Sequence, residues 1–216
     1  MKAIHYTVQG EAAQVLQYAE QGVPVPEPGE VRVRLRASGV NPSDTKSRRG
    51  GPNRPIAAPL VIPHSDGAGD IDAVGEGVDP RRIGERVWVW NAQWQRAFGT
   101  AAEYVALPSA QAVPLPPGLD YAEGACLGIP GRTAMQAVRL SEASPGKVVL
   151  VAGGAGAVGH YAVQIAKARG ATVVTTVSSA RKAEHARALK TIPQTPLPTA
   201  DPVYGKAGPL MRLWRR

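Results

Sequence analysis

The chain has 216 residues, which is enough for one large domain or two small ones with a substantial core. Its single cysteine, Cys126, excludes a framework of disulfide bonds, and we expect that thiol to be buried. No run reaches the roughly 18 apolar residues of a membrane span, and the N-terminus lacks the apolar core of a signal peptide. We therefore expect a cytoplasmic protein with no membrane partner.

The net charge of +8 raises the question of a nucleic-acid partner. Half of the excess lies in residues 190–216, which hold five basic residues and one acid, a net of +4. Elsewhere the bases are dispersed, as where Arg32, Arg34 and Arg36 alternate with apolar residues on the expected solvent face of a strand. Because no RNP or helix-turn-helix motif accompanies the charge, nucleic-acid binding is not the function that we expect.

Glycine and proline divide the first 125 residues into short alternating or apolar runs, a pattern typical of an all-β domain. The expected strands cover 3–8, 14–19, 30–38, 68–74, 86–90 and 101–107. After Asp120, which is suited to cap a helix, the apolar spacing becomes helical, and 133–140 is predicted as a helix. Pro130 and Gly131 are expected to separate two helices in this region.

A βαβ unit is predicted from residue 148 to residue 177. Residues 148–151 are a β-branched apolar run, typical of a strand buried on both faces, and 172–177 predict a second buried strand. The helix predicted between them ends before Gly170. Its apolar positions lie on one side and are Val158, Tyr161, Ala162, Ile165 and Ala166.

Three glycines in the first turn of this unit, Gly154, Gly156 and Gly159, have G-x-G-x-x-G spacing. Glycines at such a turn permit a tight backbone, let a pyrophosphate approach, and bring helix and strand close together. Because free N–H groups and the positive end of a helix dipole attract anions, the turn predicts a dinucleotide site. A structural turn that binds no phosphate is the alternative.

The end of the second strand bears on which dinucleotide is bound. An NAD site usually has an acid about 20 residues beyond the glycines, whereas an NADP site offers small polar groups and a cation. Residues 175–182 contain no acid, so we expect NADPH as the cofactor, with Ser178, Ser179 and Lys182 nearest its 2′-phosphate. The alternative is an N-capped helix whose basic residues face solvent.

Five segments carry a resemblance to a known family: ASGVNPSD at 37–44, PHSDGAG at 63–69, GERV at 84–87, AEY at 102–104, and residues 146–167. Together they resemble the medium-chain dehydrogenase/reductases, specifically the quinone oxidoreductase and zeta-crystallin branch, over about residues 1–189. The resemblance implies a GroES-like β domain over 1–125, an incomplete Rossmann domain with a doubly wound parallel sheet over 126–189, and an active site in the cleft between them. It also implies NADPH-dependent hydride transfer to a small quinone or enone.

The resemblance further implies roles for single residues in catalysis. Asn41 is expected to face the nicotinamide and to donate to the substrate oxygen as negative charge develops there, with Asp44 and Lys46 positioning groups or delivering a proton. Each residue has an alternative role, since Asn41 before Pro42 is suited to a turn, Asp44 to a helix cap, and Lys46 to a solvated loop.

The expected cofactor site also includes Thr133, Gly153, Ala157 and Val158. Ala157 replaces a glycine of the branch's signature, which places a methyl group close to the expected diphosphate. Zinc-dependent relatives have a Cys where this chain has Asn41, and a His-Glu pair where it has residues 65–66, Ser-Asp. We therefore predict no metal.

The resemblance stops after Leu189, where only part of a Rossmann domain has been found. We expect the strand at 148–151 to leave an exposed apolar edge, which could pair with a second copy of the chain in a homodimer. Residues 190–216, rich in proline and basic residues, are predicted to be a disordered tail, the out-of-frame or divergent end of a truncated reductase. A non-catalytic NADPH-binding remnant is therefore the alternative function.

Overall fold

A five-stranded antiparallel sheet forms the centre of the N-terminal part of the chain, in a computed structural model that describes residues 1–189. Its strand order is β6-β3-β4-β5-β7. The strands are β3 (Glu30–Gly39), β4 (Asp66–Val74), β5 (Arg86–Val89), β6 (Tyr104–Pro108) and β7 (Ala112–Pro114). Val31 and Val33 on β3 are fully buried in the core of this sheet, whereas Arg32 between them is half-buried and pairs with Asp72 at 2.8 Å. The alternation that predicted a strand here is therefore confirmed.

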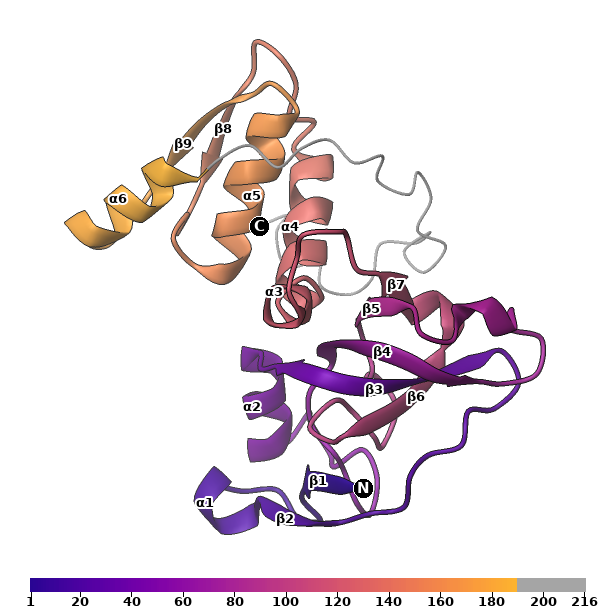
Figure 1. Ribbon diagram of the computed structural model, residues 1–216. Coiled ribbons are helices and arrows are strands. Elements are labelled where there is room, and N and C mark those ends of the chain that lie inside the picture. The colour runs from indigo at the N-terminus through magenta and orange to yellow at the C-terminus, as the bar shows by residue number, and fades with distance from the viewer. Residues whose placement is uncertain (190–216) are drawn as a thin grey trace.

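A smaller antiparallel pair, β1 (Lys2–His5) and β2 (Gln17–Glu20), lies below the five-stranded sheet in Figure 1. The strand predicted at 14–19 begins later, because a short helix, α1 (Ala12–Val15), precedes it and buries Val15. The strand predicted at 101–107 also begins later, at Tyr104, since the backbone before it bonds to β1 through Ile4 N–H and Ala101 O at 2.8 Å. Strand β7 was not predicted.

Besides α1, three short helices lie among these strands. Helix α2 (Pro42–Arg49) follows β3, and the two others are 3₁₀ turns, η1 (Pro80–Arg82) and η2 (Ser109–Gln111). Asn41 is the N-cap of α2, and the carboxylate of Asp44 accepts a hydrogen bond from its backbone N–H at 2.7 Å. Asp44 therefore does help to cap a helix, as the alternative interpretation expected.

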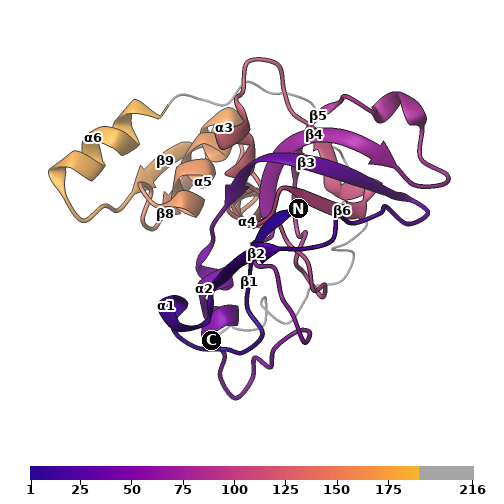
Figure 2. The ribbon, with the colours of Figure 1, turned by 60° about the horizontal axis from the view of Figure 1, so that its bottom comes forward.

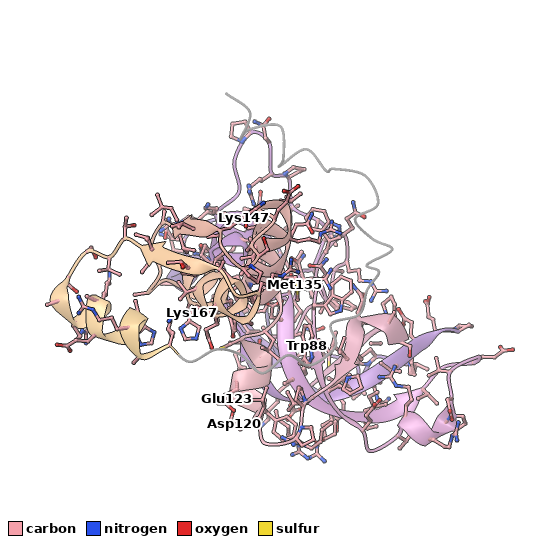
Figure 3. The ribbon with its side chains drawn as sticks, turned by 90° about the horizontal axis from the view of Figure 1, so that it is seen from above. Trp88, Asp120, Glu123, Met135, Lys147 and Lys167 are labelled. Atoms are coloured by element: carbon pink, nitrogen blue, oxygen red, sulfur yellow. The ribbon has the colours of Figure 1, made fainter. Side chains whose placement is uncertain are left out.

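Two helices, α3 (Tyr121–Ala125) and α4 (Ile129–Leu140), lie between the five-stranded sheet and the parallel strands in Figures 1 and 2. Asp120 caps α3 as predicted, because its carboxylate and that of Glu123 each accept the other's backbone N–H, at 2.7 and 2.9 Å; Figure 3 labels both. Pro130 and Gly131 do not separate two helices but lie in the first turn of α4, where the missing N–H of proline costs no intrahelical hydrogen bond. Cys126 is exposed, which corrects the expectation that it is buried.

The last described part is a parallel pair, β8 (Val148–Val151) and β9 (Thr172–Thr175), joined by α5 (Ala157–Ala168) and followed by α6 (Ala180–Ala188). Gly170 ends α5 with a positive φ of 82°, as predicted. The expected burial of β8 on both faces is wrong, since Val148 and Leu150 are 69% and 68% exposed. The reason is that only the alternate face, with Val149 and Val151, packs against α4 and α5.

The described residues thus form an antiparallel β domain followed by the start of a parallel α/β region, which is the predicted fold class. None of the helices in residues 1–189 combines the length and the apolar character that crossing a membrane requires. The predicted disordered tail, 190–216, lies outside the described residues.

Candidate functional site

The glycine-rich turn between β8 and α5 is tied to the end of β9. Gly153 has a positive φ of 68°, which glycine adopts without strain. Its N–H donates to Thr176 Oγ1 at 3.0 Å, and the N–H of Gly154 donates to the carbonyl of Thr176 at 3.1 Å. The N–H of Gly156 donates back to the carbonyl of Gly153 at 2.8 Å, which closes the turn just before α5 begins.

The three signature glycines differ in what a side chain would meet. A Cβ added at Gly154 would lie 2.1 Å from Thr175 Oγ1, and one at Gly159 would lie 2.2 Å from the carbonyl oxygen of Gly153. Packing alone therefore excludes a side chain at both positions. A Cβ at Gly156 would approach only the Gly153 oxygen, at 3.3 Å, so this position is open on its outer side.

A pocket of about 380 Å³ lies outside this turn. Its lining residues are small or polar, with one cation and no acid: Gly153, Ala155, Gly156, Thr176, Val177, Ser178 and Lys182. The ammonium group of Lys182 donates to Ser178 Oγ at 2.8 Å, so a positive charge and a hydroxyl are held together at one end. The first N–H groups of α5 have no intrahelical partner and carry the positive end of the helix dipole. The pocket therefore holds a cation and a hydroxyl that can donate hydrogen bonds to an anion, and Gly156, the N-cap of α5, is part of its wall.

Six residues predicted for the cofactor site do not line this pocket: Thr133, Gly154, Ala157, Val158, Gly159 and Ser179. Ala157 and Val158 are exposed in the first turn of α5. Thr133 is exposed on α4, and Ser179 Oγ caps α6 by accepting the N–H of Lys182 at 3.3 Å. Their contact with a cofactor stays a prediction.

A second polar cluster is centred on Asp66, at the start of β4. Asp66 is 1% exposed, and its Oδ2 accepts hydrogen bonds from the side-chain amide of Asn41 at 2.8 Å and from the backbone N–H of Ile129 at 2.7 Å. Its Oδ1 is buried with no hydrogen-bond partner among the described residues. The structure therefore brings together Asn41 and Asp44, both predicted, around an acid that the sequence analysis did not assign to the site.

Burial changes the protonation of both carboxylates in this cluster. It raises the pKa of Asp66 to about 6, against the lowering effect of the Ile129 N–H, the Asn41 amide and the positive charge of Arg132. Burial likewise raises the pKa of Asp44 to about 6, and the negative charge of Asp66 adds to that rise while the Asn41 N–H opposes it. The pKa values of both acids therefore lie about two units closer to neutrality than that of an exposed carboxylate.

The Asp66 cluster also joins the two parts of the chain. Asn41 belongs to the β domain, whereas Ile129 opens α4, which packs against α5. A Cβ at Gly128 would lie 2.1 Å from Asp66 Oδ1, so only glycine allows α4 to begin this close to the acid. Next to it, the guanidinium of Arg132 lies 3.5 Å from the centre of the buried Trp90 ring, a cation–π contact across the same boundary.

Lys46, the third predicted catalytic residue, lies exposed on α2, and its role stays a prediction. No pattern in the sequence singles out Asp66, because it lies just before the strand predicted at 68–74, which holds two further acids, Asp70 and Asp72. Within residues 1–189, no three His, Cys, Asp or Glu side chains are grouped so that they could hold a metal ion.

Known proteins match both parts of the chain. Residues 27–117 match the alcohol dehydrogenase GroES-like domain family. A quinone oxidoreductase from Rattus norvegicus is 39% identical over 158 residues, 73% of this chain and 46% of the rat protein. The solved quinone oxidoreductase from Coxiella burnetii is 31% identical with a TM-score of 0.77, covering 88% of this chain and 60% of that one. A mycobacterial structure complexed with NADPH is 31% identical with a TM-score of 0.75, covering 87% of this chain and 56% of that one.

This chain spans about half the length of the relatives that it matches. The matches include the GroES-like antiparallel domain and the start of the Rossmann region that follows it. The TM-scores of 0.75 and 0.77 agree with the fold described above. The chain belongs to the medium-chain dehydrogenase/reductase superfamily, in its quinone oxidoreductase branch.

Proposed function

We propose that this chain binds NADPH and acts as an NADPH-dependent oxidoreductase for a quinone or enone, without a metal. The observation that carries the proposal is the pocket outside the glycine turn, in which Lys182 and Ser178 are paired and no carboxylate is present. An acid there would repel a 2′-phosphate, whereas a cation and a hydroxyl attract it.

The residues present fit the two charged parts of this cofactor. The open side of Gly156 and the first N–H groups of α5 suit a diphosphate, and Lys182 with Ser178 suits the 2′-phosphate. When bound, the cofactor supplies the hydride, and the protein supplies binding, orientation and hydrogen bonds.

Asn41 is the residue that we propose to bind the substrate carbonyl. One of its two amide hydrogens goes to Asp66 Oδ2 at 2.8 Å, so the amide is oriented with its nitrogen toward the acid. The second hydrogen is then available to donate to a substrate oxygen as negative charge develops there. Asp44 holds the backbone N–H of the same residue, and we propose that it positions Asn41; Lys46 is the exposed candidate for proton delivery.

The test is a fluorescence titration of the purified chain with NADPH, with NADH as the comparison, followed by addition of a simple quinone. We expect Lys182→Ala to weaken NADPH binding by about tenfold and NADH binding little, because a charge-assisted contact contributes roughly 1.5 kcal/mol or more. The matched control is Arg181→Ala, a neighbouring cation on α6 that does not line the pocket. Equal loss of both cofactors, or the same effect from the control, would contradict the assignment of Lys182.

A non-catalytic NADPH-binding protein is the second candidate function. Within residues 1–189 the parallel sheet pairs only β8 with β9, whereas in a Rossmann fold the nicotinamide lies against the second half of the sheet. Binding of NADPH without oxidation on adding quinone would support this candidate over the reductase.

A further inference from the structure

A second pocket, the His64 pocket, lies between β1, the end of β3 and residues 100–102, apart from the nucleotide pocket. Its volume is about 290 Å³. Ile4, Leu35 and three alanines give it apolar walls, and its uncharged polar groups come from Ser38, His64 and Thr100. Strand β1, which contributes Ile4 to the pocket, lies below β3 in Figure 1. Nothing in the proposed function uses this pocket.

A chain of hydrogen bonds fixes the protons in this pocket. The hydroxyl of Thr100 donates to the backbone carbonyl of Asp66 at 2.6 Å, and that carbonyl can only accept. Thr100 Oγ1 has then used its one hydrogen, so in its 2.9 Å contact with Ser38 Oγ it must accept, and Ser38 donates. Ser38 has in turn used its hydrogen, so in its 2.9 Å contact with His64 Nδ1 it accepts from the ring. The hydrogen of the imidazole is therefore on Nδ1.

This order of donors leaves Nε2 of His64 as a lone-pair acceptor. Burial lowers the pKa of His64, which favours the neutral ring at neutral pH. Nε2 has no hydrogen-bond partner in the described part of the chain, and it is not among the buried unpaired atoms there. The ring is also held by an unusual backbone, with φ of 76°, a conformation that costs energy in a residue other than glycine.

Charge in the pocket wall is already balanced. Arg36 also lines the pocket, but its guanidinium donates to Asp70 at 2.9 Å, which removes the need for an anionic ligand. The volume exceeds the roughly 150 Å³ that suffices for a benzene ring in an apolar cavity. The pocket therefore suits one small ring that is uncharged and carries a hydrogen-bond donor.

We propose that the His64 pocket is a binding site for a small, uncharged aromatic alcohol, whose hydroxyl group donates to Nε2 of His64 while its ring lies against Ile4 and Leu35. The hydroxyl of the ligand is the recognised group, because the other polar atoms in this series of hydrogen bonds, from His64 Nδ1 through Ser38 and Thr100 to the Asp66 carbonyl, already have partners. The proposal does not depend on NADPH binding or on quinone reduction.

Phenol is the probe, and anisole, in which a methyl group replaces the hydroxyl hydrogen, is the matched control ligand. The measurement is long-range proton–nitrogen NMR of the ¹⁵N-labelled chain, which reports the tautomer of each histidine. We expect His64 to have its hydrogen on Nδ1, and phenol to shift its Nε2 signal while His160 and His185 stay unchanged. Anisole should bind roughly fivefold to tenfold more weakly, because it cannot donate the hydrogen bond.

The matched variant is His64→Gly. Because glycine favours a positive φ, we expect this variant to keep its fold and Tm, checked by circular dichroism, while the phenol-induced shifts of the amides in β1 and β3 are lost. A His64 hydrogen on Nε2, equal binding of phenol and anisole, or undiminished phenol binding by a folded His64→Gly variant would each overturn the proposal.

Discussion

Replacement of Asp66 by asparagine tests the electrostatics of the cluster that joins the two parts of the chain. The pKa of Asp66 is about 6 in the folded protein and 3.8 for the ordinary carboxyl group, a rise of roughly two units. At 1.36 kcal/mol per unit, the rise corresponds to roughly 3 kcal/mol of lost stability once the acid is ionised. The side chain is 1% exposed, so solvent screens little of this cost.

The sign of the pH dependence follows from the raised pKa. Between pH 4 and pH 6 the folded state holds a proton on Asp66 that the unfolded state has lost, so stability falls as the pH rises through this range. Above pH 6 both states are ionised and the full cost is present. Asp44 acts in the same direction and is coupled to Asp66, so the two acids together govern the fall. Replacing one of the two acids should remove about half of this fall in stability.

The assay is urea unfolding of the wild-type chain and of Asp66→Asn at intervals from pH 4 to pH 8. The amide leaves a buried donor unpaired where Oδ1 was, which costs about 1–3 kcal/mol. Because the variant is spared the ionisation cost of Asp66 at higher pH, the slope of stability against pH is compared rather than the absolute value. The control is Asp72→Asn on the same strand, whose carboxylate pairs with Arg32 at a half-exposed position. If Asp66→Asn and the wild type lose stability in parallel between pH 4 and pH 6, the reasoning about Asp66 is refuted.

Two further predictions concern the parallel region. Gly159→Ala should lower the free energy of unfolding, measured in urea, by about 1–3 kcal/mol, because its methyl group would lie 2.2 Å from the backbone oxygen of Gly153. The control, Gly131→Ala in α4, has no atom within 4 Å of the added methyl group and should stabilise the fold slightly. Equal effects of the two substitutions would contradict the packing argument. Ser179→Ala removes the cap of α6 and should cost about 1 kcal/mol, seen as faster amide hydrogen exchange confined to α6; unchanged exchange there would argue against the cap.

The sequence predicted the elements whose cause is local. The period-two burial of Val31 and Val33 and the glycine turn before α5 depend on neighbours within a few residues, and both are confirmed. The region around Gln14 was predicted wrongly because its alternation suits a strand, whereas the structure forms a short helix that packs Val15 against Tyr6 and Val61. That contact joins residues 46 positions apart, which no local pattern shows.

The polar clusters could be predicted only in part, for the same reason. Asn41 and Asp44 are three residues apart and were predicted together, but Asp66, which accepts from the Asn41 amide, lies at the start of β4. Which ring nitrogen of His64 carries the hydrogen likewise depends on Ser38 and Thr100, which come from separate segments of the fold. Residue type indicated which groups can react or bind, while tertiary contact decided which of them meet.

The energetic cost of Asp66 bears on why a carboxylate is suited to this position. A loss of roughly 3 kcal/mol is a large fraction of the 5–15 kcal/mol that stabilises a typical domain, and an apolar residue at this position would avoid that ionisation cost. An apolar residue, however, leaves the amide of Asn41 and the N–H of Ile129 without an acceptor. A carboxylate accepts from both at once, and it thereby fixes the direction of the Asn41 amide and the start of α4 with a single group. The position therefore gives up stability for orientation, which is the arrangement expected where a side chain has to present a hydrogen-bond donor to a ligand.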